Sequence, residues 1–125
     1  MTKELFYKLL NEIDQNCLDI LGDRNSKYAS DEDRLHNFNA GAEILGGTPA
    51  QACWGYLVKH LTALRDMIQR DDFSDREDFL EKCTDCINYI RLLYCIGNSK
   101  PRSEVVECNK SSMYIGPNSL DTTAF

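Results

Sequence analysis

Six residues within the polar stretch 22–38 have side chains suited to binding a phosphorylated molecule. Arginine and lysine bind phosphate as cations, arginine through two parallel hydrogen bonds, and tyrosine can stack on a base. Asparagine can bind the polar edge of a base or a ribose hydroxyl. The residues concerned are Arg24, Asn25, Lys27, Tyr28, Arg34 and Asn37. Such a local basic cluster can hold phosphate whatever the net charge of the chain.

Acidic residues in the same stretch leave a second interpretation open. They are Asp23, Asp31, Glu32 and Asp33. They can neutralise the nearby cations in a solvated loop, because ion pairs on exposed loops are common and weak. The acids that follow Ser30 also occupy the favourable place at a helix N-terminus, so phosphate is not expected to bind at that helix end.

A second set of polar side chains lies on a helix predicted from residue 74 onward. At 100° per residue, Glu81, Asp85 and Asn88 share one stripe of this helix. Toward the C-terminus the stripe becomes apolar, as in the wall of a cleft whose acid pair holds a metal or a ligand hydroxyl. The alternative is a solvated face that ends in a subunit contact.

The preceding helical segment supplies the complementary groups Tyr56, Lys59 and His60. Lys59 and His60 can form ion pairs with the acid stripe, or they can bind phosphate as cations. His60 can also be a structural hydrogen-bonding group. Its role therefore depends on whether these side chains meet at one cavity.

The elements that must position these groups are helices. Apolar residues recur at helical spacing over four segments, at residues 3–21, 30–45, 48–70 and 74–96. Periodicity is lost over residues 98–125, which we expect to form a flexible or loosely docked tail behind a helical domain at 1–97. The predicted fold is all-α and resembles a four-helix bundle, and a homo-oligomer is expected.

Local signals place the ends of these segments. Gly22 is expected to end the first helix and Ser30 to cap the second. Thr48, followed by proline, is expected to begin the third. Ser74 and Glu77 have the spacing of a capping box at the start of the fourth.

Each helix has an apolar stripe that is expected to face the core, and in the second helix its members are Leu35, Phe38, Ala42 and Leu45. In the first helix they are Phe6, Leu9, Leu10, Ile13, Cys17, Ile20 and Leu21. In the third they are Trp54, Leu57, Val58, Leu61, Leu64 and Ile68. In the fourth they are Leu80, Cys83, Ile87, Ile90 and Tyr94.

The charge balance argues against a long nucleic acid as partner. The chain has 14 lysines and arginines against 20 acids, a net charge of -6, and a pI of about 4.8. No overall positive field therefore attracts a polyanion. The N-terminal residues mix charges with apolar side chains and show neither a signal peptide nor a membrane span, so a cytoplasmic protein without a membrane partner is expected.

The six cysteines are expected to be reduced and to behave as small apolar residues, because most lie within helical patterns. Cys83 and Cys86 can converge on one helix face. A zinc site needs four ligands, however, and only Cys53 and His60 are further candidates. Core packing is therefore favoured over metal binding.

The order of three segments resembles a known family. The segments "DRNSKYASDEDRLHNF", "TPAQACWGYLVKHLTALRDMI" and "EKCTDCINYIRLL" resemble small phage-encoded proteins related to the MazG-like all-α nucleoside triphosphate pyrophosphohydrolases. The resemblance covers roughly residues 18–96. It implies a helical nucleotide site in which two pairs of carboxylates, on two helices, hold Mg²⁺ against the triphosphate.

The sequence departs from that family pattern at the carboxylates. Glu81 and Asp85 are four residues apart and could stand in for the later pair, although the spacing differs. The third helix has Lys59 and His60 where the earlier pair would lie, and Glu43 has no acid partner three or four residues away. Two carboxylates beside cations suit holding a phosphorylated ligand better than cutting it.

The resemblance and the missing acids together predict non-catalytic binding of a small nucleotide-derived ligand, with no cofactor. By analogy with phage proteins, the role would be to sequester a cyclic nucleotide or cyclic ADP-ribose type immune signal in the host cytoplasm. One alternative is a Mg²⁺-dependent pyrophosphohydrolase in which Glu81 and Asp85 bind the metal, with Glu43 as a further acid. Another is a structural adaptor that binds a protein through its last helix.

Overall fold

The protein is built from helices. The computed structural model describes residues 1–28 and 33–99, with the side chains of residues 23–28 excepted. This part of the chain contains four helices and no strand: α1 (Lys3–Tyr28), α2 (His36–Leu45), α3 (Pro49–Arg70) and α4 (Arg76–Gly97). The predicted all-α class with four helices is confirmed. The predicted tail lies outside the described residues from position 100 onward.

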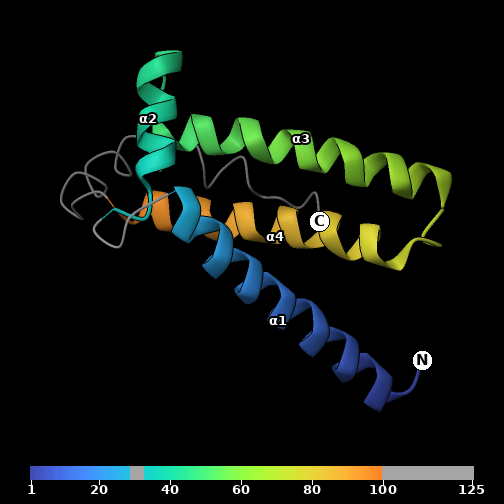
Figure 1. The fold of residues 1–125 in the computed structure, drawn as a ribbon. Helices are drawn as coiled ribbons and strands as arrows, with labels where there is room; N and C mark the ends of the chain where they lie inside the picture. Colours follow the sequence, from blue (N-terminus) through green and yellow to red (C-terminus); the bar gives the residue numbers. More distant parts are fainter. Residues whose placement is uncertain (29–32, 100–125) are drawn as a thin grey trace, which may run out of the picture.

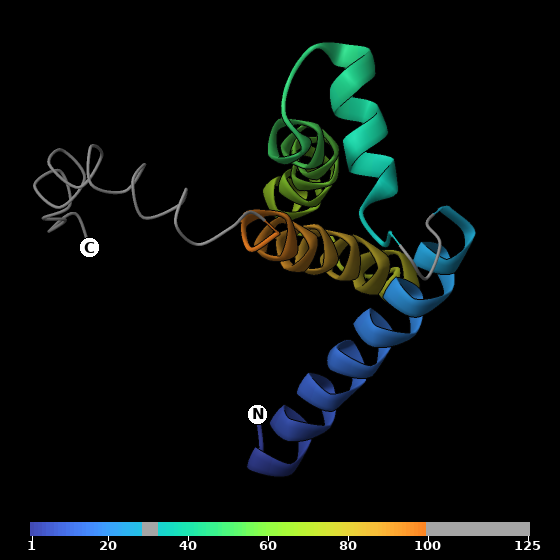
Figure 2. The same ribbon diagram turned by 90° about the vertical axis from the view of Figure 1, so that its left-hand side faces the viewer.

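α3 and α4 form an antiparallel pair, and the other two helices pack on it. α2 crosses the beginning of α3, whereas α1 crosses α4 and then diverges from it toward the N-terminus (Figure 1). Figure 2 shows α2 and the C-terminal end of α1 on the same side of the α3–α4 pair. No described helix covers the opposite side of the pair.

α1 is longer than predicted, because Gly22 does not end it. A glycine ends a helix when it adopts the left-handed conformation, and among the described glycines only Gly46 has a positive φ. With an ordinary helical backbone, Gly22 only weakens the helix, at a cost of about 1 kcal/mol relative to alanine. The helix therefore continues to Tyr28.

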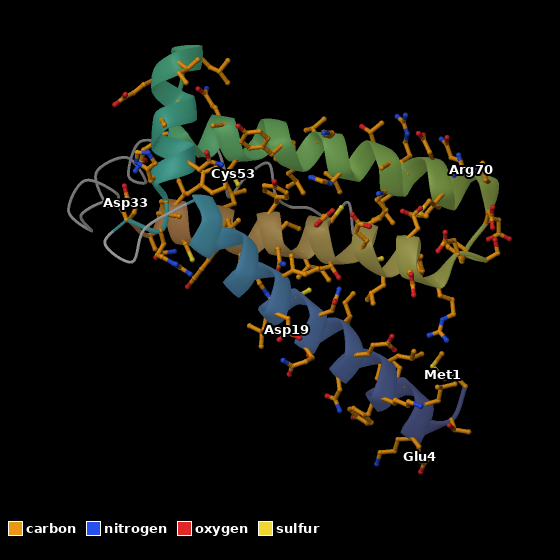
Figure 3. The ribbon with its side chains drawn as sticks, in the orientation of Figure 1. Met1, Glu4, Asp19, Asp33, Cys53 and Arg70 are labelled. Atoms are coloured by element: carbon orange, nitrogen blue, oxygen red, sulfur yellow. The ribbon has the colours of Figure 1, made fainter. Side chains whose placement is uncertain are left out.

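Only the second half of the predicted core stripe of α1 is buried. Cys17 is completely enclosed, whereas Phe6 and Leu10 are exposed. Met1 and Glu4 lie at the end of α1 that diverges from α4 (Figure 3). The first turns of this amphipathic helix therefore have no described helix to cover their apolar face.

α2 begins later than predicted. Its first residue is His36, and its N-cap residue, Leu35, offers no side-chain acceptor. The carboxylate of Asp33 accepts a hydrogen bond from the backbone N–H of Leu35 at 3.0 Å, so an aspartate turn leads into the helix. The predicted cap, Ser30, lies outside the described residues. α2 ends at Gly46, whose φ of 75° is the left-handed conformation that glycine tolerates. Phe38 and Ala42 are buried as predicted, whereas the prediction that Leu45 is buried is wrong, since Leu45 is 76% exposed.

The start of α3 confirms its sequence prediction. Thr48 Oγ1 accepts a hydrogen bond from the backbone N–H of Gln51 at 3.1 Å. In return, Gln51 Oε1 accepts one from the backbone N–H of Thr48 at 2.9 Å. With Pro49 at the first helical position, this capping box leaves fewer unpaired donors at the helix end.

Replacement of Thr48 by alanine is therefore expected to lower the free energy of unfolding by about 1 kcal/mol. Urea denaturation followed by circular dichroism measures this change. Thr62 is a matched control because its hydroxyl donates to the carbonyl of Val58 within the same helix, and Thr62→Ala should be neutral or slightly stabilising. An equal loss in both variants would contradict a specific role for the cap.

The start of α4 differs from its prediction by one residue. The N-cap is Asp75, whose carboxylate accepts a hydrogen bond from the backbone N–H of Asp78 at 3.1 Å. Ser74 instead donates its hydroxyl to Asp72 at 2.6 Å. The hydrogen bonds from the Ser74 hydroxyl and backbone lower the pKa of the Asp72 carboxyl below its ordinary value. The predicted capping box of Ser74 and Glu77 is therefore wrong.

The apolar core lies where α2, α3 and α4 meet. Phe38, Cys53 and Ile96 form its buried centre, with Leu92 and Leu93 packed against it. Figure 3 labels Cys53 on α3, beside α2. This end of the α3–α4 pair therefore carries the apolar core of the described residues.

Candidate ligand-binding site

Three polar side chains of α4 point inward, which changes the predicted orientation of this helix. Thr84 is fully buried, and Asp85 and Asn88 are each only 5% exposed. The predicted core stripe is wrong at its C-terminal end, where Ile90 and Tyr94 are 55% and 74% exposed. The stripe that carries Asp85 and Asn88 is therefore not a solvated face.

Asp85 faces α3, where it meets His60. One carboxylate oxygen, Oδ2, lies 3.4 Å from Nδ1 of His60. A carboxylate beside Nδ1 favours a proton on that nitrogen and fixes the ring, so Nε2 of neutral histidine remains an acceptor for another group. The side chain of His60 is 21% exposed, so this oriented imidazole lies at the edge of the protein.

Aromatic rings continue from His60 toward α2. His60 stacks on Tyr89 with a centroid separation of 5.0 Å, and Tyr89 stacks on Tyr56 at 6.1 Å. Tyr56 in turn meets Phe38 edge to face at 6.2 Å. Tyr56 is 41% exposed, so the column runs from the buried core to a surface on which another flat ring could stack.

Asn88 and Thr84 face α1 instead of α3. The side-chain amide of Asn88 donates to the backbone carbonyl of Cys17 at 3.0 Å. The amide of Asn16 donates to the hydroxyl of Thr84 at 2.8 Å. These bonds join α1 to α4 at their crossing point, so Asn88 has a structural role in addition to any contact with a ligand.

Two buried polar atoms of α4 have no hydrogen-bond partner among the described residues: Asn88 Oδ1 and Arg91 Nη1. Buried polar groups are usually paired, so each of these atoms could bind an added donor or acceptor. Arg91 was not predicted from the sequence. The available signal was its position three residues after Asn88, which places it on a neighbouring part of the same helix face.

The other predicted site residues are only partly brought together. Glu81 and Lys59 are exposed, as is Asn37 near the start of α2, and Arg34 is half-buried. The predicted contacts at Arg24, Asn25, Lys27 and Tyr28 lie outside the described side chains. Their backbone forms the last turns of α1, next to the beginning of α2 (Figures 1 and 2).

The carboxylates of α4 do not form the predicted acid pair. Glu81 is exposed, whereas Asp85 is buried beside His60. Within residues 1–22 and 33–99, no three carboxylate, histidine or cysteine side chains are close enough together to share a metal ion.

The described cysteines are reduced: Cys17, Cys53, Cys83, Cys86 and Cys95. Burial raises the pKa of the Cys53 thiol, and it does the same for Cys83 and Cys86. A raised thiol pKa reduces the thiolate fraction at neutral pH and with it the reactivity. These three thiols therefore behave as part of the helix packing.

Brief treatment of the native protein with iodoacetamide is expected to modify Cys95, which is exposed, before Cys53 and Cys86. Peptide mapping by mass spectrometry gives the order of modification. All described cysteines should react at similar rates in 6 M guanidinium chloride, because unfolding removes their burial. Early modification of Cys53 in the native protein would contradict the packing around it.

None of the helices within the described residues combines the length and the apolar character needed to cross a membrane. No protein-family model, no curated protein sequence and no solved structure matches the chain. The resemblance to MazG-like proteins therefore stays a prediction.

Proposed function

We propose that this chain binds a small nucleotide-derived ligand, without hydrolysing it, beside the His60 end of the aromatic column. The observation that supports this most directly is His60, which lies beside the carboxylate of Asp85 and stacks on Tyr89. An oriented imidazole next to stacked rings combines a hydrogen-bonding group with a π-surface. Proteins hold unpaired bases by these two features.

The phosphate of such a ligand would be held by cations around this surface. Lys59 is exposed and directly precedes His60 on α3. Arg24 and Lys27 belong to the last turns of α1, and we propose that they contact phosphate as the sequence predicts. These local positive charges would then attract the phosphate despite the net negative charge of the chain.

The different environments of the two α4 carboxylates support binding without cleavage. Hydrolysis of a triphosphate by the MazG-like mechanism needs several carboxylates that share Mg²⁺. Asp85 lies beside His60, and Glu81 lies in solvent. In this proposal the protein is a degenerate MazG-like protein that keeps the nucleotide site, and its role is to sequester a cyclic nucleotide or cyclic ADP-ribose type signal for a phage.

A thermal-shift assay with nucleoside triphosphates, cyclic dinucleotides and cyclic ADP-ribose isomers, with and without Mg²⁺, tests the proposal. A ligand at one hundred times its Kd stabilises the folded state by about 2.7 kcal/mol, which raises Tm by several degrees. Lys59→Ala should reduce that rise, whereas Lys3→Ala, at the far end of α1, should not. No shift with any compound would contradict the proposal.

We propose in addition that the chain acts as a homo-oligomer. The ligand surface lies on the side of the α3–α4 pair that carries α2 and the end of α1. No helix within the described residues covers the other side of the pair, and we propose that a partner subunit binds there.

A further inference from the structure

We infer that the open side of the α3–α4 pair is an interface with a second copy of this chain, in which α3 packs antiparallel against α3 of the partner about Leu61. The inference deepens the proposed homo-oligomer and does not depend on the nucleotide ligand. Its support comes from the spacing, symmetry, charge and size of this surface.

The exposed side chains of α3 have the spacing of a coiled-coil seam. Alternating steps of four and three residues connect Trp54, Val58, Leu61, Arg65 and Ile68. All four apolar members are exposed, Trp54 and Ile68 by more than half, so the prediction that they face the core is wrong. Together with Leu64 and Thr62, the last four members line a shallow apolar hollow on this face. A helix that already packs on α4 thus carries a second face shaped to receive another helix.

Three of the five seam residues match one another across a two-fold axis at Leu61, whereas Val58 and Arg65 lie opposite Leu64 and Leu57 of the partner subunit. Leu61 lies seven residues after Trp54 and seven before Ile68. In an antiparallel pair, Leu61 therefore lies opposite Leu61 of the partner subunit, and Trp54 opposite Ile68 of the partner subunit. A two-fold interface requires this kind of symmetry, in which each residue faces its counterpart across the axis.

The charges on this seam do not oppose pairing. Arg65 is its only ionic residue, and its Nη2 lies 3.4 Å from the carboxylate of Asp66. The dimer would therefore bury no unpaired charge at the seam, which would be costly. The long apolar stem of Arg65 can also lie along the partner helix while its charged end stays in water.

α4 enlarges the same surface. At 100° per residue, Ile90 lies roughly opposite Thr84 and Asn88, which face α1, and it is 55% exposed. On α3, Trp54 likewise lies opposite the positions that pack on α2. Because α2 and the C-terminal end of α1 lie on one side of the pair in Figure 2, the exposed stripe of α3 and Ile90 of α4 fall on the other side.

The area of this surface suits a dimer. α3 and α4 each have 22 residues. A helix of that length extends about 33 Å, and packed helices lie about 10 Å apart. The pair therefore presents roughly 33 by 20 Å, or about 650 Å², close to the roughly 800 Å² per partner of a standard interface.

Sedimentation velocity of the full chain over a dilution series tests this inference. The wild type is expected to be a dimer at micromolar concentration. Trp54 is the only tryptophan, so its emission should shift to the red as the dimer dissociates. A wild type that stays monomeric at 200 μM would overturn the inference. A monomer with blue-shifted Trp54 emission would also overturn it, because another segment of the same chain would then cover this surface.

Introducing a charge at Leu61 tests the register of the two α3 helices. Leu61→Glu and Leu61→Lys should each weaken self-association at least tenfold, because like charges would face each other on the axis. An equimolar mixture of the two variants should restore the dimer. Ile44→Glu, at an 83% exposed position on α2, is the control and should leave the dimer intact.

Circular dichroism checks that both Leu61 variants keep the helical content of the wild type. Ile68→Glu provides a second disruption of the seam if either variant unfolds. Unchanged dimerisation in Leu61→Glu, or failure of the folded mixture to reassociate, would overturn the proposed pairing.

Discussion

Replacement of Phe38 by alanine is expected to lower the free energy of unfolding by about 3–5 kcal/mol, which is a large part of the stability of a domain of this size. Phe38 is buried at the centre of the core and meets Tyr56 edge to face. Its removal leaves a cavity between α2 and α3. Because Tyr56 begins the aromatic column that reaches His60, the same change should also weaken ligand binding.

Urea denaturation of Phe38→Ala and of wild type measures the change in stability. Ile44→Ala is the matched control, since Ile44 lies on the same helix but is exposed. It should change the free energy of unfolding by no more than about 0.5 kcal/mol. A loss below about 1 kcal/mol in Phe38→Ala would show that α2 does not pack as described.

Replacement of Asp85 by alanine is expected to have the largest effect on the proposed function. It removes the carboxylate beside His60 Nδ1, so the imidazole loses its fixed orientation. We expect at least tenfold weaker ligand binding, measured by isothermal titration calorimetry. Stability should also fall, because the substitution removes a buried carboxylate that lies beside His60.

A double-mutant cycle separates the Asp85–His60 contact from other effects of the substitution. If the two side chains interact, Asp85→Ala combined with His60→Ala should destabilise the protein by less than the two single changes together. Glu81→Ala is the matched control, because it removes an exposed carboxylate one turn earlier on α4. Equal binding by wild type and folded Asp85→Ala would contradict a role for Asp85 in orienting His60.

The helices were predictable where short-range chemistry decides their ends. Thr48 with Pro49 begins α3 as predicted, because the capping bonds involve only neighbouring residues. At Gly22 the same kind of reasoning was wrong, since the left-handed conformation that ends a helix depends on more than the presence of glycine. Ser74 was also wrong, because Asp75 competes for the capping position and Asp72 accepts the serine hydroxyl.

The inward face of α4 could not be chosen from periodicity alone. Two arcs of the helix can be buried, and the more apolar one, with Ile90 and Tyr94, was predicted to face the core. Burial of Asp85 and Asn88 depends on partners far away in sequence, His60 and the carbonyl of Cys17. The sequence thus identified His60 and Asp85 as candidates, but their contact and the aromatic column required the three-dimensional arrangement.

Mass spectrometry of bound material tests most directly whether the chain holds a nucleotide-derived ligand intact. The purified full chain is incubated with the same panel of triphosphates, cyclic dinucleotides and cyclic ADP-ribose isomers, with and without Mg²⁺. The unbound and heat-released fractions are then analysed. We predict recovery of one compound, chemically unchanged, from the denatured wild-type protein and far less from Asp85→Ala. Conversion of a triphosphate to monophosphate and pyrophosphate only with Mg²⁺, or release of no compound at all, would contradict this prediction.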